Sequence, residues 1–389
     1  MDHQPLVSII INNYNYGRFL KEAIDSAIHQ SYPNVEVIVV DDGSADNSTQ
    51  IIRDYAHDLK PVLKENGGQA SAFNAGFKVS RGEIIIFLDS DDILFPTAVE
   101  NAVKLFSDEK VAKVHWPLWR VNEYGIKTGE IIPEYPLAQG DLQDAVIQFG
   151  PNACGGPPNS PPTSGNAWSR KFLDHVFPIP EADFKTGADQ YLFVLAPVYG
   201  ELSALSEPGG CYRVHGSNDT LKPLEEYIAA FSGWFEKCCL ILRLHLQKIG
   251  IDVNTANWKR DHWFHLIDAA IQDITKVIPP AAEFILVDGN QWGTGEIIAG
   301  RRRKLFIERE GKYWGAPKDE AAAIQEIKRQ QKKASFIVFA WPAFWWLDYY
   351  SKMYDYLNSN YNLILKNERV IIFSLQKGFT DKLFLNNMN

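Results

Sequence analysis

Three aspartates, Asp89, Asp91 and Asp92, stand together directly after the apolar run Ile84–Leu88. Carboxylates this close repel one another, so they cannot all stay ionised at low cost unless a cation lies between them. Oxygen ligands select Mg²⁺ or Mn²⁺, which keep coordination positions open for diphosphate oxygens. The cluster therefore predicts a divalent metal site. An aspartate-rich helix N-terminus is the alternative interpretation.

The aspartates lie within a repeating pattern of apolar strands and amphipathic helices that covers the first hundred residues. This pattern is typical of an α/β fold with a parallel sheet. Three polar clusters each follow a predicted strand: Asn12–Asn15, Asp41–Ser44 and Asp89–Asp92. Because ligands collect at the carboxyl ends of strands in open α/β sheets, we expect these clusters to meet at one edge.

The length of the chain predicts more than one domain, because 389 residues exceed what one hydrophobic core usually serves. We expect a catalytic α/β domain over residues 1–222 and a helical linker region over residues 223–280. Within the linker region, Trp258–Val277 has the apolar spacing of one long amphipathic helix. A smaller C-terminal α/β accessory domain is expected over residues 281–389.

Charge and cysteine content narrow the classes of function. A formal net charge of -9 argues against a protein whose main task is binding nucleic-acid phosphates, so no nucleic-acid partner is expected. The four cysteines form no CxxC pair, and they are too few for a disulfide framework. No signal peptide is visible either. We therefore expect a cytoplasmic protein, with peripheral contact to the inner face of the membrane as a further possibility.

Five motifs occur in order along the first domain. They are Val7–Ile10 with Tyr14-Asn15, Val39–Ser44, Asn66–Gln69, Asn74–Gly76 and Phe87–Asp92. Together they closely resemble family 2 glycosyltransferases, over roughly residues 5–217. The resemblance implies a GT-A type, Rossmann-like nucleotide-binding fold, a nucleotide-diphosphate sugar as donor, and inversion at the anomeric carbon.

The same resemblance assigns roles around the nucleotide. Tyr14 is expected to stack on the base, and Asp42 to accept a hydrogen bond from a base N–H, which favours uracil or thymine. Asn12 lies where the family contacts the nucleotide, and Gln69 is expected to lie over it. The residues Asp41–Ser44 also have the composition of a turn with a helix cap, and both interpretations can hold.

For the metal, the resemblance implies that Asp91 is a direct ligand that clamps the diphosphate, while Asp89 faces the ribose or the metal. His215, in the stretch Tyr212–His215, is expected to complete the metal or diphosphate site. A hydrogen-bonded structural histidine is the alternative for His215.

Inverting transfer requires a general base that takes the proton of the acceptor hydroxyl. In the resemblance this base is Asp189, although Ala188 replaces the glutamate that usually precedes it. A helix N-cap is the alternative role for Asp189. Thr163, Ser164 and Gly165 fall where relatives line the sugar and acceptor pocket.

These features together predict a metal-assisted transferase that moves a sugar from a UDP- or dTDP-sugar to a hydroxyl of a glycan or lipid-linked acceptor. A non-catalytic module that binds a sugar nucleotide or a glycan on the same fold is the alternative. Nothing in the sequence resembles a hydrolase nucleophile with its base, or a GxxxxGK phosphate loop.

The C-terminal part is less informative. The apolar stretch Ala334–Leu347 is too short to span a bilayer, and we expect a buried strand followed by a helix over Pro342–Asn358. The alternative is an interfacial anchor with the basic residues of Lys328–Lys333. We expect Arg301–Arg303 to form a solvated basic turn.

Overall fold

The computed structural model describes residues 4–133, 136–154, 160–216, 224–260, 262–289, 291–292, 297–309 and 312–376. Two compact units are present. The first unit contains Met1–Leu221 and Trp234–Lys259, and the second contains Lys222–Gly233 and Arg260–Asn389.

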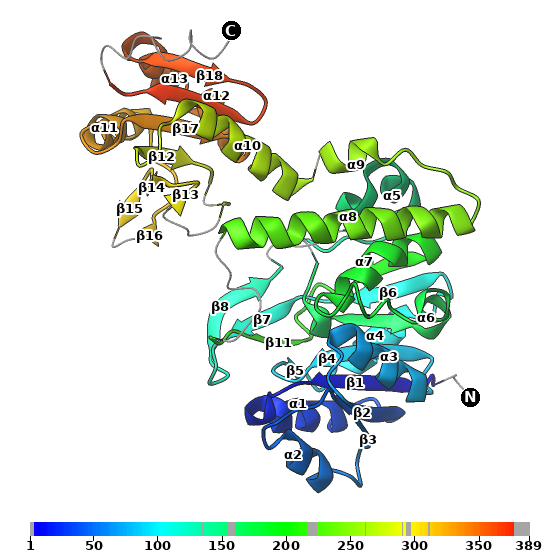
Figure 1. The fold of residues 1–389 in the computed structure, drawn as a ribbon. Coiled ribbons are helices and arrows are strands. Elements are labelled where there is room, and N and C mark those ends of the chain that lie inside the picture. Colours follow the sequence, from blue (N-terminus) through cyan, green and yellow to red (C-terminus); the bar gives the residue numbers. More distant parts are fainter. Residues whose placement is uncertain are drawn as a thin grey trace. The chain divides into compact units, whose positions relative to one another are not determined.

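Within the described residues, seven strands form the main sheet of the first unit (Figure 1). Their order is β10 (Glu201–Ala204), β6 (Val111–His115), β9 (Asn166–Ser169), β4 (Ile84–Asp89), β1 (Val7–Asn13), β2 (Val35–Asp41) and β3 (Lys60–Leu63). Neighbouring strands are parallel except at β9, which runs antiparallel to β4 and β6. The predicted α/β fold is therefore confirmed.

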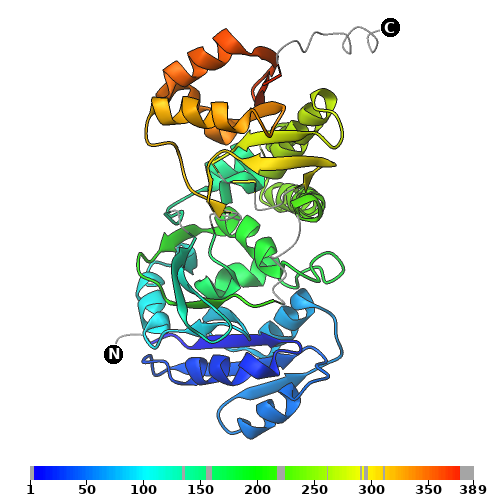
Figure 2. The ribbon, with the colours of Figure 1, turned by 90° about the vertical axis from the view of Figure 1, so that its left-hand side faces the viewer.

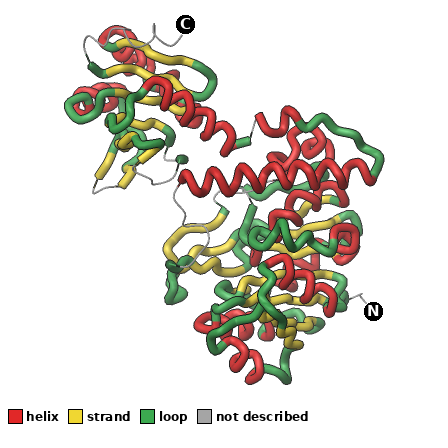
Figure 3. The backbone as a smooth tube through the Cα atoms, in the orientation of Figure 1, coloured by secondary structure: helices red, strands yellow, loops and turns green. Residues whose placement is uncertain are grey.

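Helices cover both faces of this sheet, as the near-continuous apolar strands require. Helices α1 (Gly17–Ile28) and α4 (Ala98–Leu105) pack on one face of the sheet. Helix α1 runs beside β1 in both ribbon views (Figure 1, Figure 2). The other face buries α3 (Gln69–Val79), α6 (Arg170–Val176) and α7 (Ala188–Tyr199). Strands and helices alternate along the first hundred residues, with α2 (Ser48–Asp54) after β2 (Figure 3).

A second sheet in this unit has four described strands, in the order β5 (Ile93–Leu94), β11 (Gly210–Arg213), β7 (Leu118–Val121) and β8 (Lys127–Ile132). Strand β5 begins directly after the aspartate cluster, and it pairs with β11 through Ile93 and Cys211. This pairing brings residues near position 213 to a cluster near position 91.

Much of the region predicted as a linker is built into the first unit. From Trp234 onward, α8 (Leu224–Lys248) belongs to this unit, and its Leu242 and Leu246 are fully buried in the core beside α7. Tyr199 of α7 also shares a 2.8 Å hydrogen bond with His245 of α8. From Arg260 the chain belongs to the second unit. The predicted linker region is therefore divided between the two units along the sequence.

The second unit contains a sheet of six described strands. Their order is β13 (Ile297–Ile298), β14 (Arg301–Leu305), β12 (Glu283–Val287), β17 (Phe336–Ala340), β19 (Val370–Ser374) and β18 (Asn362–Lys366). Helix α10 (Trp263–Val277) packs on one face, and α11 (Glu320–Gln330) and α13 (Ser351–Asn360) pack on the other. All residues of β17 are buried, as predicted for a strand inside Ala334–Leu347.

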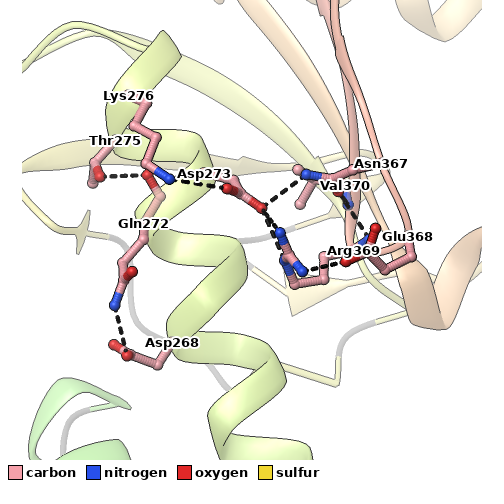
Figure 4. A network of polar contacts seen from close by, with 9 residues as sticks. All are labelled: Asp268, Gln272, Asp273, Thr275, Lys276, Asn367, Glu368, Arg369 and Val370. Carbon is pink, nitrogen blue, oxygen red and sulfur yellow. Dashed lines mark hydrogen bonds and ion pairs between the residues drawn. The ribbon is translucent and has the colours of Figure 1, made fainter. Parts of the chain in front are cut away.

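A carboxylate on α10 connects this helix to the turn between β18 and β19 (Figure 4). Asp273 accepts hydrogen bonds of 2.9 Å from both Arg369 and Asn367. Lys276, one turn further along the helix, forms a 3.5 Å ion pair with the same carboxylate. Asp273 is only 7% exposed, so its charge is neutralised almost entirely inside the protein.

Two of the predicted helices are wrong in extent. The expected helix Trp258–Val277 is divided into α9 (Ala256–Arg260) and α10, because His262 before α10 has an extended backbone. The expected helix Pro342–Asn358 is divided into a short 3₁₀ turn, α12 (Trp345–Tyr349) and α13. The break falls at the buried Tyr350, whose hydroxyl donates to the carbonyl oxygen of Pro317.

The expected basic turn at Arg301–Arg303 is also wrong. These residues begin the paired strand β14, and the side chains of Arg301 and Arg303 are buried. The guanidinium of Arg301 donates to the carbonyl oxygens of Thr275 and Ile278, at the end of α10. It therefore satisfies helix-end carbonyls that have no partner within the helix. Among the residues that the structure describes, no helix combines the length and the apolar character needed to cross a membrane.

Candidate active site

The polar clusters after β1, β2 and β4 meet at the carboxyl edge of the main sheet, as predicted. Strand register places Asn12 beside Asp89 and Asn13 beside Asp41. The Asn12 amide donates to Asp89 over 2.8 Å, and the Asn13 amide donates to Asp41 over the same distance. Within the described residues, the buried side-chain oxygens of Asn12 and Asn13 have no hydrogen-bond partner. Two buried acceptors at this edge are thus unsatisfied within the described residues.

The loop after β2 forms the predicted turn, and Asp41 organises it. The Ser44 hydroxyl donates to the Asp41 carboxylate over 2.6 Å, and the Ser44 backbone N–H donates over 3.1 Å. Gly43 has a φ of 80°, which side chains disfavour. The Ser44 hydroxyl also accepts from the backbone N–H of Asn15, so this turn holds the loop that carries Tyr14. The Tyr14 side chain is 48% exposed and accessible for stacking.

Asp42 holds the loop before α3. Its buried carboxylate forms a 2.5 Å ion pair with Lys64 and accepts from the backbone N–H groups of Gly67 and Gly68 at 3.0 and 2.7 Å. Gly68 is required here because a Cβ would lie 2.6 Å from the carbonyl oxygen of Lys185. The contact of Asp42 with a base stays a prediction, and these bonds supply a second, structural role.

The aspartate cluster is electrostatically crowded. Burial, and then the neighbouring Asp91 carboxylate, raise the pKa of Asp89 to about 7. The same two causes, in the same order, raise the pKa of Asp92 well above its ordinary value. Asp92 is 1% exposed and accepts hydrogen bonds from the Ser164 hydroxyl and the Arg213 backbone N–H, at 2.6 and 2.9 Å. A cation beside Asp91 would relieve this repulsion.

The structure brings together the two predicted metal residues, Asp91 and His215. The Nε2 atom of His215 lies 2.9 Å from the Asp91 carboxylate. The His215 ring is 5% exposed, and its centroid lies 5.3 Å from that of Tyr16 and 5.0 Å from that of Phe19. Within the described residues, no third histidine, cysteine or acidic side chain completes a metal-binding group with them.

Arg213 was missed as a site residue, although its neighbour His215 was singled out. It is 1% exposed, and its Nε donates to the Asp91 carbonyl oxygen over 2.8 Å. The same guanidinium donates to the Glu22 carboxylate of α1 over 2.7 Å. Arg213 therefore fixes the backbone of the aspartate cluster against the first helix. The motif around it could have indicated a role, but not this partner.

The predicted pocket residues Thr163, Ser164 and Gly165 form a buried 3₁₀ turn beside the cluster. The Ser164 hydroxyl accepts from the Asp89 backbone N–H over 3.1 Å and donates to the Asp92 carboxylate. Both hydrogen bonds of this hydroxyl are therefore made within the protein. The Thr163 hydroxyl donates to Asp189 over 3.3 Å. Direct contact of these residues with a sugar stays a prediction.

Asp189 lies in the first turn of α7 and is 9% exposed. The N-cap position is occupied by Gly187, so the alternative role of Asp189 as N-cap is not supported. Burial raises the pKa of Asp189 to about 6, a value suited to a general base near neutral pH. Gln69 accepts from the Ala188 backbone N–H over 2.9 Å and thereby fixes the start of this helix.

Phe73 stands directly before the motif Asn74–Gly76. Phe73 is fully buried, and its ring stacks on that of Phe87 with 4.0 Å between centroids. This position therefore contributes to the core and supplies no positive charge to the site.

Comparison with known proteins agrees with this geometry. Residues 8–176 match the family model described as glycosyl transferase family 2. An uncharacterized glycosyltransferase of Nostoc sp. is 36% identical over 217 residues, which are 55% of this chain and 66% of that protein. The chondroitin synthase of Pasteurella multocida is 39% identical over 137 residues, which are 34% of this chain but 14% of that protein.

Among solved structures, S. aureus TarS 1-349 in complex with UDP-GlcNAc is similar over 96% of this chain and 97% of that chain. The TM-score is 0.50 and the sequence identity is 16%, so this likeness concerns the fold alone. The chain spans 66% or less of the length of the two curated relatives described above. With the family model, the shared motifs and the fold in agreement, residues 8–176 constitute a glycosyltransferase family 2 domain of GT-A type.

Proposed function

We propose that the first unit is an inverting glycosyltransferase that uses a nucleotide-diphosphate sugar, with a UDP- or dTDP-sugar favoured. One observation carries the proposal: two adjacent hydroxyls of the 3₁₀ turn connect the donor side to the general base, because Thr163 donates to Asp189 over 3.3 Å and Ser164 accepts from the Asp89 backbone N–H over 3.1 Å. The donor-side carboxylates and the general base thus lie on either side of one short turn. A sugar bound over Thr163 could then meet both the departing diphosphate and an incoming acceptor.

The proposed reaction is a single displacement. The acceptor oxygen attacks the anomeric carbon, the bond from that carbon to the diphosphate oxygen breaks, and the nucleoside diphosphate leaves. Asp189 takes the proton of the acceptor hydroxyl, because its raised pKa places it near the operating pH. Attack opposite the leaving group inverts the anomeric configuration. A glycan or lipid-linked hydroxyl is the proposed acceptor.

The site residues fit a divalent cation. Mg²⁺ and Mn²⁺ are commonly held by one or two carboxylates together with substrate phosphates, and the adjacent Asp91 and His215 would supply the protein ligands. Such an ion, when bound, stabilises the negative charge of the leaving diphosphate. The raised pKa values of Asp89 and Asp92 support this proposal, because burial and the neighbouring carboxylates disfavour ionisation and a bound cation would favour it.

Calorimetric titration with UDP, with and without Mn²⁺, tests the donor site. Wild type should bind UDP in a Mn²⁺-dependent manner, and Asp91→Asn should lose at least about tenfold in affinity, because a charged ligand is removed. Asp54→Asn, on the exposed side of α2, is the matched control and should bind like wild type. Equal UDP affinity with and without the metal would contradict the proposed metal site.

Turnover separates the enzyme from the non-catalytic alternative. Slow hydrolysis of a nucleotide sugar by wild type, lost in Asp91→Asn, is expected from a transferase whose acceptor is absent. Metal-dependent UDP binding without turnover of any donor, in the presence of a broad acceptor panel, would favour the binding module.

A further inference from the structure

Lys113 is a charged residue in the interior of the first unit. It lies in the middle of β6, opposite Trp168 of β9, and it is fully buried. Its ammonium nitrogen lies 4.2 Å from the ring centroid of Phe193 and 5.4 Å from that of Trp168. The side chain therefore lies on the face of the sheet that α7 covers.

This position is close to the proposed base. Phe193 and Asp189 are four residues apart in α7, so they lie one turn apart on the same side of the helix. The ammonium thus lies against a residue that is one helix turn from Asp189. Its charge acts on Asp189: burial raises the pKa of Asp189, whereas the positive charge of Lys113 lowers it.

The other charged and titratable groups near Asp189 do not substitute for this cation. Asp89 of β4 is an acid, and its interaction with Asp189 disfavours ionisation of both carboxylates. His115 follows Lys113 on the same face of β6, and burial and then Lys113 hold its pKa well below the ordinary value, so it stays neutral. Gln69 and Thr163, from α3 and the 3₁₀ turn, contribute dipoles only.

Packing alone does not account for a lysine here. An ammonium group taken out of water costs several kcal/mol unless it interacts with opposite charge. Cation–π contacts with the Phe193 and Trp168 rings offset part of that cost. The buried carboxylate of Asp189, one helix turn from Phe193, adds an interaction with opposite charge.

We propose that Lys113 is a positioning residue for transfer: its buried ammonium holds Asp189 in the ionised form and in the orientation needed to accept a proton. The inference rests on the proposed function, in which Asp189 is the base. Lys113 itself contacts neither the donor nor the acceptor in this proposal.

The rate of transfer as a function of pH tests it. Lys113→Met should shift the acidic limb of the kcat profile upward by about 0.5–1 pH unit and lower kcat at pH 6 by about two- to fivefold. The donor KM should change less than about twofold, and Lys113→Arg should restore most of the wild-type profile. Lys110→Met removes an exposed lysine just before the same strand and should leave the profile unchanged. An unshifted acidic limb in a folded Lys113→Met protein would overturn the proposal.

A double-mutant cycle on the melting temperature provides a second test, which does not require enzymatic activity. At pH 8, Lys113→Met should lower the melting temperature more in wild type than in Asp189→Asn, because only wild type then carries a buried unpaired carboxylate. If Lys113→Met does not fold, the double variant should fold. Equal effects in both backgrounds, or a double variant that also fails to fold, would overturn the proposal. A wild-type protein that transfers no sugar would instead refute the proposed function, while the cycle still reports on the Lys113–Asp189 interaction.

Discussion

Buried carboxylates in the two units have opposite environments. In the first unit, Asp89 and Asp92 lie beside Asp91, and burial together with that neighbour raises the pKa of both groups. In the second unit, burial alone would raise the pKa of Asp273, but hydrogen bonds from Arg369 and Asn367 outweigh it, so the pKa is lowered. The second unit stabilises the ionised form of its buried carboxylate, whereas the first unit disfavours the ionised form of Asp89 and Asp92.

The contrast distinguishes a structural carboxylate from a functional one. Asp273 connects α10 to the turn between β18 and β19, and its bonds are complete without a ligand (Figure 4). The Asp91 carboxylate has His215 beside it, and its acidic neighbours are only partly stabilised. Charge that the fold leaves uncompensated is a signal for a cation or substrate. The following four predictions test this contrast.

The largest expected effect is on catalysis. Asp189→Asn should lower the rate of sugar transfer by about 10²–10⁴-fold, because an amide cannot take the acceptor proton. Asp273→Asn should leave the rate within about twofold of wild type, since it lies in the other unit. Initial rates at saturating donor, measured on protein of verified fold, decide between these outcomes. Comparable losses of transfer rate in Asp189→Asn and Asp273→Asn would contradict the distinction between a functional and a structural carboxylate.

The second expected effect is on the stability of the second unit. Asp273→Ala leaves Arg369 and Asn367 without their shared acceptor and should cost about 2–3 kcal/mol. Hydrogen exchange of the amides in α10 and β19 reports this local loss. Asp268→Ala on the same helix is the matched control, because its exposed carboxylate contacts only Gln272 among the described residues. The control should cost less than about 0.5 kcal/mol.

The third prediction concerns pH, where the two carboxylates should behave oppositely. The folded-state pKa of Asp189 is raised to about 6, so its ionisation destabilises the fold increasingly as pH rises from about 4 to 6. The free energy of unfolding of Asp189→Asn should therefore rise relative to that of wild type over that window, by roughly 3 kcal/mol at pH 7. Asp273 has a lowered pKa, so its stabilisation is present above about pH 4 and is lost in more acidic solution.

Denaturant titration of both variants at several pH values checks these signs. The stability difference between Asp189→Asn and wild type should be flat above about pH 7, where the carboxyl is ionised in both states. A difference that shrinks between pH 4 and 6 would show that burial does not destabilise this carboxylate.

The smallest effect is expected at Ser164, which connects two members of the aspartate cluster. Ser164→Ala removes a 2.6 Å donor to Asp92 and the acceptor of the Asp89 backbone N–H. We expect a loss of about 1–2 kcal/mol in stability and a few-fold loss in kcat/KM for the donor. Ser107→Ala, at an exposed helix end, is the control for the same chemical change. If Ser164→Ala has the stability and the kcat/KM of wild type, this hydroxyl does not organise the aspartate cluster.

Local sequence patterns predicted the site where one strand and its following loop suffice. Asn12, Asp41 and Asp89 lie at or next to the ends of parallel strands. Adjacent strands of a parallel sheet end at the same edge, so the convergence of these residues followed from the pattern alone. Asp91 and His215 were paired by resemblance to a family, and the pairing of β5 with β11 explains why they meet.

Other features depended on partners that sequence patterns do not identify. A lysine at position 113 interrupts a buried apolar strand, which was a visible signal, but its interaction with α7 follows from sheet order. Arg301 was mistaken for a solvated residue because its acceptors, at the end of α10, lie 23 and 26 residues away in the chain. The extent of α10 was overestimated because apolar spacing continues across the break before it.

By itself, the sequence determined the α/β fold of the first unit, the edge at which its polar residues gather and the family of its domain. These depend on the alternation of strands and helices and on residues close together in the chain. Only the tertiary structure decided that Asp42 holds the loop before α3, that Arg213 anchors the aspartate cluster, and that the Lys113 ammonium lies against Phe193, which is one turn from Asp189 in α7. Such contacts join residues that are distant in the chain, and packing of whole elements determines which of them meet.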